Sequence, residues 1–346
     1  SSSVDTANPT ECDSYVTNAA CVATITSGGT VGGLADFDSF NSDGFDLIID
    51  DQFPADLQVI AICLGGDSIT NQTVSNFTKA GAVGTYDAVT ALGYTPNFVA
   101  IINISRGNSG ADPHSYNSFG AAVSSGSQIC ISTSSRDART SNTICESYAL
   151  DSVEILAVPV SGSINERQAF VDFAPSTGTG FELNYLETAP ATIMYNYLTM
   201  AGGNYAVGSL LTRTDTNDIT VSGLGFRPAA VLLFSACATE STQDARSLND
   251  IYSIGAFTSS SNAMAVVSRD NHGLAAAAEV STAIDFDKCY INLDASGNVQ
   301  GLMEARSINS DGFTVGMTDA DPSASWVGYI AFGLETVVGN LAWITA

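Results

Sequence analysis

Serine and histidine are the residues of this chain that could support nucleophilic catalysis, and Ser68 is the serine in the most suggestive setting. It lies in the segment 66–70 (GDSIT), directly after an apolar stretch. A serine nucleophile needs a general base within hydrogen-bond reach. The chain has two histidines, His114 and His272, so few catalytic pairs can form.

Segment 66–70 resembles the nucleophile motif of GDSL-type hydrolases, in which the serine acts with a distant Asp-x-x-His. The family pairing is missing, because Ala111 and Arg269 stand three residues before the two histidines. The pair Gly65-Gly66 also has a counterpart at Gly202-Gly203, where no serine motif follows. We therefore interpret the segment as a turn and expect no enzymatic activity. A hydrolase remains a third hypothesis, which an activated-ester assay on the protein and on Ser68→Ala would test.

Two Arg-Asp pairs, Arg136-Asp137 and Arg269-Asp270, each follow a serine. On exposed loop tips these four residues could contact a partner, and they are the candidate partner-contact loops of the chain. The alternative is a structural turn, in which the arginine bonds to nearby carbonyls or to the acidic surface. Neither interpretation supplies a catalytic or cofactor-binding residue.

The cysteines and aspartates predict no metal site or other cofactor. Seven cysteines include no Cys-x-x-Cys pair, so zinc is not expected. In an oxidising medium Cys12 could form a local disulfide with Cys21, and Cys130 with Cys145. The alternative is that the cysteines are small apolar core residues. No spacing matches a calcium loop, so a divalent cation is possible but not predicted at the two acidic clusters. These clusters are Asp36, Asp38, Asp43 and Asp46, and Asp319 and Asp321.

The 346-residue chain is strongly acidic, with 11 Lys and Arg against 36 Asp and Glu and a net charge of −25. Nucleic-acid binding needs clustered Lys and Arg, so no nucleic-acid partner is expected. Like-charge repulsion keeps such a surface soluble, and salt screens it. No apolar run approaches the ~20 residues that span a bilayer, so no membrane partner is expected. Ser1 follows no initiator Met or signal-like stretch, and it is expected to be a processed or truncated end.

The composition predicts an all-β fold. Hydrophobic residues make up 45% of the chain and charged residues 14%, and there are 31 glycines. Together with the many small polar residues, this indicates short strands and turns around a real core. No long stretch shows the helical period.

An internal repeat organises the chain. Residues 92–99 (LGYTPNFV) match residues 224–231 (LGFRPAAV). Shorter matches follow in the same order at nearly the same offset, such as 118–121 with 253–256 and the two Ser-Arg-Asp triplets. Matches in a constant order at a nearly constant offset indicate duplicated units.

A turn signature before an apolar strand occurs three times. Its copies are Asp43-Gly44-Phe45, Thr179-Gly180-Phe181 and Asp311-Gly312-Phe313. Asn-Ser-Asp-Gly is a turn sequence in which glycine supplies a positive φ, and the phenylalanine is expected to anchor the next strand in the core. Continuous apolar runs at 99–102 and 231–234 are typical of strands that cross a sandwich core.

These repeats predict tandem antiparallel β-sandwiches of a jelly-roll-like kind. One unit is expected at 67–203 and a second at 204–333. Residues 1–66 contain the turn and the final strand but no opening motif, so we interpret them as the back half of a unit. Residues 334–346 resemble the opening strand of a further unit, or an exchange strand.

Two explanations fit the incomplete ends. The chain could be cut from a longer tandem array, or the tail could pair with the N-terminal half-unit of the same or a neighbouring subunit. Half a sandwich leaves an open strand edge and an apolar face, and so it needs a partner. We expect the N-terminal segment to be completed by strand addition, from the C-terminal tail or another chain.

The last unit resembles a repeat domain of tailed-phage virion surface proteins. The resemblance rests on 220–228 (TVSGLGFRP), on 309–316 (NSDGFTVG) and on the closing strand 326–333 (WVGYIAFG). The middle unit replaces Asn-Ser-Asp by other residues, and the first lacks the opening motif. The resemblance implies a structural or adhesive role in a virion and carries no catalytic residue.

The leading hypothesis is therefore a non-enzymatic structural protein of a bacteriophage particle, of capsid-decoration, spike or tail-fibre type. It predicts an oligomer on the virion surface or outside the cell, with other virion proteins, copies of itself and a host surface glycan as partners. The alternative is a carbohydrate-binding adhesin or cell-surface module. In that case exposed aromatic rings would form sugar platforms, and the candidates are Tyr116, Tyr148, Tyr252 and Trp326.

Overall fold

The computed structural model describes residues 2–3, 12–17, 19–26, 30–42, 44–54, 58–78, 86–103, 110–112, 114–136, 145–151, 156–160, 163–173, 178–187, 193–237, 245–247, 249–271, 280–333 and 341–345. Within these ranges the regular elements are strands, no helix occurs, and the strand pairs are antiparallel. The prediction of an all-β fold is confirmed. Among the described residues no helix is long and apolar enough to cross a membrane.

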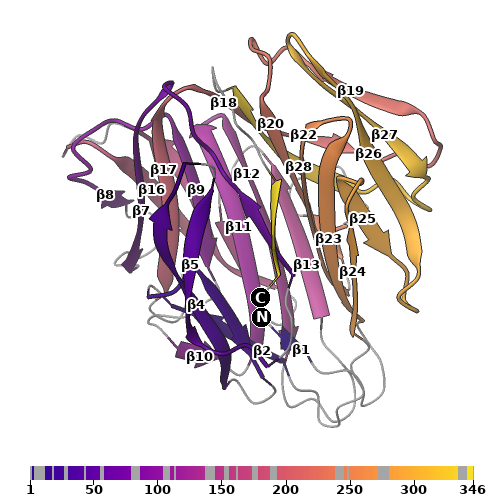
Figure 1. Ribbon diagram of the computed structural model, residues 1–346, viewed down its shortest axis with the longest axis horizontal. Helices are drawn as coiled ribbons and strands as arrows, with labels where there is room; N and C mark the ends of the chain where they lie inside the picture. Colours follow the sequence, from indigo (N-terminus) through magenta and orange to yellow (C-terminus); the bar gives the residue numbers. More distant parts are fainter. Residues whose placement is uncertain are drawn as a thin grey trace.

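The first half of the chain forms a β-sandwich of two sheets (Figure 1). Its large sheet runs in the order β21 (Ala245–Ser247), β13 (Cys145–Asp151), β12 (Ser127–Arg136), β11 (His114–Ser124), β9 (Phe98–Asn103), β17 (Met194–Gly202) and β7 (Ile69–Thr78). Its small sheet runs β14 (Leu156–Val160), β15 (Ser163–Asp172), β16 (Phe181–Glu187) and β8 (Tyr86–Val89). We call this pair of sheets the first sandwich.

The second sandwich follows in the chain. Its large sheet runs β18 (Asn204–Leu211), β28 (Trp326–Gly333), β20 (Ala230–Ser235), β22 (Asn249–Ser259), β23 (Asn262–Asn271) and β24 (Val280–Asp285). Its small sheet runs β19 (Asp218–Ser222), β27 (Gly312–Asp319), β26 (Val299–Asn309) and β25 (Tyr290–Leu293). Strand β21 comes from the chain between β20 and β22, yet it pairs with β13 and so joins the first sandwich to the second.

The strands of the two sandwiches follow the same order in space. The large sheets run β7-β17-β9-β11-β12-β13 and β18-β28-β20-β22-β23-β24. Strands at the same place in the two sheets therefore also follow the same order along the chain. The small sheets run β8-β16-β15-β14 and β19-β27-β26-β25. In both large sheets the closing strand, β17 or β28, lies between the opening strand and the strand that follows a proline.

Three apolar cores hold these sheets together. Each sandwich has its own core, centred on residues such as Phe181 and Tyr195 in the first and Phe257 and Phe313 in the second. The third core lies between the two large sheets, where Phe98 packs against Tyr205 and Phe332 with ring centroids 5.1 and 5.8 Å apart. The large sheets are therefore apolar on both faces, which explains the continuous apolar runs in β9 and β20.

The repeated turn signature is hydrogen-bonded to the repeated Leu-Gly-aromatic motif in both sandwiches. In the second sandwich the Asp311 carboxylate accepts hydrogen bonds from the backbone N–H groups of Gly223 and Gly225, at 3.0 and 2.5 Å. In the first, the hydroxyl of Thr179 takes the same place and accepts from the N–H of Gly93 at 3.2 Å. The turn before the core strand therefore ties down the loop that precedes the proline.

The N-terminal residues form smaller sheets. Strands β3 (Val22–Ile25), β4 (Val31–Phe40) and β5 (Phe45–Asp51) make one three-stranded sheet. Strand β6 (Gln58–Ile62) pairs with β29 (Leu341–Thr345) near the other end of the chain. A third sheet contains β1 (Ser2–Ser3), β2 (Cys12–Val16) and β10 (Gly110–Asp112).

Candidate assembly surface

One face of the N-terminal sheet β3-β4-β5 corresponds to a buried face of the second sandwich. The turn glycine Gly44 corresponds to Gly312, and the strands on either side of each turn keep matching registers when counted from that glycine. The matching pairs are Phe37↔Leu47 with Ala305↔Val315, and Ala35↔Ile49 with Met303↔Met317. Side chains at directly opposed positions share one face of a sheet, so these residues mark the same face in both places.

The exposure of this face differs sharply between the two sheets. In the second sandwich Ala305 is 4% exposed and Met317 is fully buried, because the large sheet covers them. In the N-terminal sheet Phe37 is 46% and Ile49 is 49% exposed. The N-terminal sheet therefore has an apolar face like the one that the large sheet covers in the second sandwich. Here two side chains of that face remain about half exposed to solvent.

Strand β6 has an open edge among the described strands. In the sandwiches the closing strands β17 and β28 each pair with a strand on both sides. Strand β6 stands at the corresponding place after β5, and its described partner is β29 alone. Unpaired backbone groups along such an edge form a template for an added strand.

A cavity of about 320 Å³ lies where the N-terminal part meets the two sandwiches. Ile62 of β6, Phe119 of β11 and Leu232 of β20 line it, together with side chains of β22 and β23. All its lining residues except Gly255 have apolar side chains. Strand β6 thus lies near the face of the second sandwich's large sheet that is turned toward the first sandwich. It leaves part of the space next to that face unfilled.

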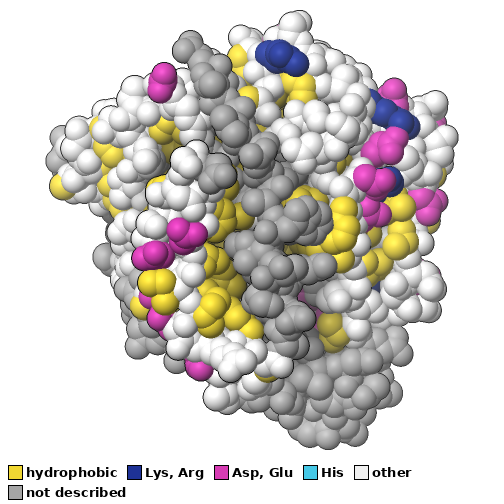
Figure 2. Space-filling view, in the orientation of Figure 1, with side chains coloured by type: hydrophobic (Ala, Val, Ile, Leu, Met, Phe, Trp, Pro, Cys, Tyr) yellow, Lys and Arg dark blue, Asp and Glu magenta, His cyan; other side chains and the backbone are white. Residues whose placement is uncertain are grey.

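The N-terminal part carries an unusual share of the negative charge. Residues 1–66 contain ten Asp and Glu and no Lys, Arg or His, whereas the rest of the chain holds the other acidic residues and all 11 Lys and Arg. Figure 2 shows acidic and apolar side chains mixed over the region of β4 and β5. A surface of this kind attracts basic partners at low ionic strength.

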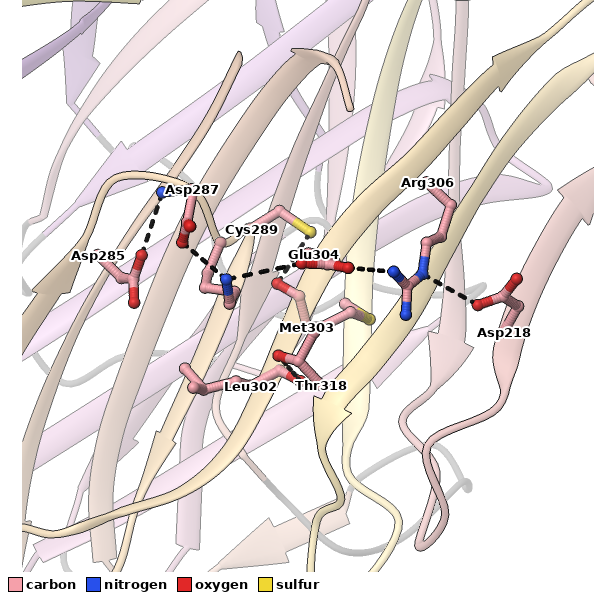
Figure 3. A network of polar contacts seen from close by, with 10 residues as sticks. Asp218, Asp285, Asp287, Cys289, Leu302, Met303, Glu304, Arg306 and Thr318 are labelled. Atoms are coloured by element: carbon pink, nitrogen blue, oxygen red, sulfur yellow. Dashed lines mark hydrogen bonds and ion pairs between the residues drawn. The ribbon is translucent and has the colours of Figure 1, made fainter. Parts of the chain in front are cut away.

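The opposite face of the same small sheet in the second sandwich, which is turned away from the core, balances its carboxylates with cations (Figure 3). Glu304 on β26 forms ion pairs with Lys288, at 3.6 Å, and with Arg306. Arg306 also bonds to Asp218 on β19, with 3.1 Å between Nε and Oδ1. These contacts connect strands β19 and β26 of the small sheet with the segment before β25.

The corresponding carboxylate of the N-terminal sheet has an acidic neighbour instead. Asp36 stands on β4 where Glu304 stands on β26, at the same position relative to the turn glycine. A hydrogen bond with Asp50, together with partial burial and the charge of Asp50, raises the pKa of Asp36. Among the described residues no ion pair joins β4 or β5 to a Lys or Arg. The positive charge that would balance this sheet is not provided by its own residues.

The second predicted Arg-Asp pair does not form an exposed loop. Arg269 and Asp270 lie within strand β23 and are 8% and 4% exposed. Arg269 donates to the carbonyl of Leu293 at 2.5 Å and to the amide oxygen of Asn271 at 2.8 Å. The prediction of an exposed partner-contact loop is therefore wrong for this pair, and the carbonyl-bonded alternative describes Arg269. Arg136 ends strand β12, and its side chain and Asp137 lie outside the described residues.

Asp270 instead belongs to a buried polar cluster that the sequence reasoning missed. It stands opposite Asp250 in the β22–β23 ladder, accepts a hydrogen bond from Ser135 at 2.5 Å and lies 3.9 Å from the thiol of Cys12. Burial, aided by the charge of Asp270, raises the pKa of Asp250 to about 7, and a hydrogen bond from Thr133 opposes this rise. An aspartate at the start of the strand 249–259, directly before the mostly apolar residues 251–257, was the available signal.

This cluster joins strands from separate parts of the chain. Ser135 belongs to the first sandwich, Asp250 and Asp270 to the second, and Cys12 to β2. Their side chains are at most 9% exposed, which gives a substrate little access. The arrangement is suited to fixing the contact between the sandwiches, and the charge of Asp270 favours the protonated form of Asp250.

Segment 66–70 forms a turn at the start of β7. The N–H of Ile69 donates to the carbonyl of Gly66 at 3.1 Å, and Asp67 and Ser68 occupy the turn. Gly202 packs so closely that a Cβ there would overlap the carbonyl oxygen of Ser68. His272 lies outside the described residues, as does the side chain of His114.

The cysteines do not form the local disulfides considered from sequence. Cys12, Cys21 and Cys130 carry thiols, and Cys130 stands opposite Leu150 rather than Cys145 in the β12–β13 ladder. Burial raises the pKa of the Cys237 thiol to about 12 and strongly raises that of Cys289. The core interpretation fits these last two cysteines, which are 5% and 0% exposed.

The acidic clusters gather no metal-ligand set among the described residues. Asp319 is exposed, whereas Asp321 is 1% exposed and accepts hydrogen bonds from Thr212, Tyr290 and Asn292. Its role is to hold the segment before β28. Asp43 lies outside the described residues.

The aromatic residues considered as sugar platforms are not exposed where the structure describes them. Trp326 is 3% exposed and Tyr252 is partly buried, and both belong to the core between the large sheets. The side chains of Tyr116 and Tyr148 lie outside the described residues.

Comparisons with known proteins identify no relative. No family model matches the chain, and searches of curated proteins and of solved structures return no match.

Proposed function

We propose that this chain is a non-enzymatic structural protein of a virus particle, of phage capsid-decoration, spike or tail-fibre type, which assembles through jelly-roll-like β-sandwich repeats. The observation that carries the proposal is the combination of two sandwiches with equal strand order and an N-terminal sheet whose strand registers match those of the second sandwich. Such a molecule packs and docks through sheet faces and edges, which is what a particle subunit must do.

The proposal takes residues 67–203 and 204–333 as copies of one unit. Equal strand order supports this, as do equivalent contacts at matching positions of the repeat, such as Thr179 with Gly93 and Asp311 with Gly225. A further pair is Gly180 and Gly312, which both have positive φ and would overlap a carbonyl oxygen if a Cβ were added. Shared backbone requirements of this kind are expected of duplicated units.

Residues 1–66 and 334–346 are taken as parts of a third unit. The sheet β3-β4-β5 supplies its small sheet, β6 supplies its closing strand, and β29 supplies its opening strand. The pairing of β29 with β6 repeats that of β18 with β28. In this interpretation the C-terminal tail completes the N-terminal unit in part.

A non-enzymatic role is supported by the chemistry of the described polar groups. Three of the buried carboxylates are engaged by neighbouring protein groups, namely those of Asp250, Asp270 and Asp321. The cavity at the junction offers an almost wholly apolar lining. Catalytic pockets usually combine apolar walls with a few convergent polar groups.

Immunogold labelling of purified virus particles would test the proposal. An antibody raised against the recombinant chain is applied to particles isolated from the biological source of the gene. We expect gold label on the particle surface and the chain as an abundant component in mass spectra of washed particles. A chain that separates completely from the particles on a density gradient would overturn the proposal.

A further inference from the structure

We propose that the N-terminal partial unit binds an extended, basic segment of a different protein, which adds as a strand to the open edge of β6. Apolar side chains of that segment would cover Phe37 and Ile49, and its Lys or Arg residues would be attracted by the net negative charge of residues 1–66. This inference rests on the tandem-unit interpretation of the proposed function and names the partner's chemistry.

The apolar face of the N-terminal sheet shows where the segment lies. Every described residue that matches Phe37, Leu47 and Ile49 in the second sandwich is at most 4% exposed, because the large sheet covers it. Phe37 and Ile49 keep nearly half of their surface in water. Covering two such side chains is favourable because apolar surface leaves water.

The backbone of β6 shows how the segment is oriented. In the second sandwich β28 pairs with β18 on one side and with β20 on the other, both antiparallel. In the N-terminal unit β29 fills the place of β18, and no described strand fills the place of β20. The added segment therefore takes the place of a β20-type strand and runs antiparallel to β6.

Charge selects a different protein over a second copy. The segment 1–66 holds ten acidic residues and no basic one, and the whole chain carries −25. Two copies would repel each other across this surface. Both β20-type strands of the chain, β9 and β20, are also already paired on both sides within their own sandwiches. A basic strand from another protein satisfies the edge, the apolar face and the charge together.

A synthetic peptide serves as the probe. It carries residues 227–236 of this chain, which include β20, followed by two lysines and a fluorophore. Binding to the full-length protein is followed by fluorescence anisotropy at low and at physiological salt. We expect saturable binding, with affinity that falls about tenfold on raising the salt because charge attraction is screened.

Two control peptides separate the contributions. One carries an N-methyl group at the residue equivalent to Leu232, and the second ends in two glutamates instead of two lysines. Both are expected to bind at least tenfold more weakly, because one loses a backbone donor at the sheet edge and the other is repelled. Equal binding of all three peptides would overturn the proposal.

Matched protein variants locate the site. Ile49→Ser removes an exposed apolar side chain from the proposed face, and Val299→Ser removes one that is 43% exposed in the second sandwich. We expect weaker peptide binding for Ile49→Ser and unchanged binding for Val299→Ser. Hydrogen exchange in the presence of peptide is expected to slow at the amides of residues 58–62. Slowing elsewhere without slowing at β6 would overturn the proposal.

The oligomeric state distinguishes the occupants. We do not expect light scattering to detect a dimer that the peptide dissociates. If a dimer forms and competes with the peptide, the occupant is a second copy and the proposal is wrong. If no peptide binds while immunogold still labels virus particles, this inference fails and the proposed structural function stands.

Discussion

Asp311 shows how one side chain can join two sequence motifs into a single structural element. Its carboxylate accepts from two backbone N–H groups of the loop before Pro228, while Thr179 makes one such contact in the first sandwich. The sequence predicted the turn, and it identified the Leu-Gly-aromatic motif before the proline only as part of the repeat. It could not predict that one binds the other, because the contact joins positions far apart in the chain.

Removing this carboxylate should lower stability. Asp311→Ala leaves two backbone donors with water alone, and we expect the free energy of unfolding to fall by about 1–2 kcal/mol. Asp311→Thr, which imitates the first sandwich, should lose about half as much. Urea unfolding midpoints measure both changes. An Asp311→Ala protein as stable as the wild type would show that the motifs are independent.

The buried pair Asp250 and Asp270 should make stability depend on pH. The pKa of Asp250 is raised from 3.8 to about 7, so between these values the folded protein holds a proton that the unfolded chain has lost. Stability should therefore fall as pH rises through this window, by up to about 1.4 kcal/mol per pH unit, and level off above it. Asp250→Asn should flatten the slope between the two pKa values. Thermal unfolding across this range measures it, with Asp319→Asn as an exposed control that keeps the slope.

Arg269 and Asp270 show the limit of residue-level prediction. A charged pair after a serine is typical of a surface turn, and the sequence offered no sign of burial. The groups that bury and bind them, Leu293 on β25 and Ser135 on β12, come from distant parts of the chain. Local patterns cannot predict such partners, since tertiary packing decides them.

At the scale of elements, the glycines of the turn signature set the approach of neighbouring strands. Gly312 has a φ of +153°, and a Cβ there would overlap the carbonyl oxygen of Val221; Gly180 has the same relation to Val89. The sequence predicted a positive φ at Gly312, which ends an Asn-Ser-Asp-Gly turn, but made no such prediction for Gly180. The close approach of strands β19 and β27 became visible from the structure alone.

Substituting Gly312 should be costly. Gly312→Ala is expected to destabilise the protein by about 2 kcal/mol or more, because the side chain strains the backbone and displaces β19. Gly126→Ala is the matched control, since a Cβ at Gly126 meets no atom within 4 Å. Chemical denaturation compares the two variants. Equal losses in both would contradict the packing argument.

Element boundaries were predictable where turns and apolar runs alternate. The runs 99–102 and 231–234 lie in β9 and β20, and the phenylalanines after two copies of the turn signature, Phe181 and Phe313, are fully buried. Phe45, in the third copy, keeps part of its surface exposed. This difference follows from what covers the sheet, which the identical motif does not encode.

At the scale of the whole molecule, the core between the two large sheets should couple the sandwiches. Phe98→Ala removes a ring that contacts Tyr205 and Phe332 of the other sandwich, and we expect a loss of about 3–5 kcal/mol. Calorimetry should then show two separated transitions. Phe181→Ala, inside the first sandwich, should lower stability without such separation. A single transition in Phe98→Ala would mean that other contacts provide the coupling.

The sequence predicted the strand-rich class and two matching segments, but not how the segments meet. Nothing in the repeat indicated that the large sheets pack face to face, or that β21 crosses from one sandwich to the other. The absence of Lys and Arg from residues 1–66 was a readable signal of an acidic surface. The sequence did not show which face of the N-terminal sheet is exposed to solvent.

The two-sided apolar character of β9 and β20 has a practical consequence for anyone who dissects this protein. If either sandwich were expressed alone, the face of its large sheet that normally packs against the other sandwich would be exposed to solvent. That face is broad and apolar. Such a piece should precipitate or stick to itself, however well its own interior is packed. The smallest fragment worth expressing therefore keeps both sandwiches together.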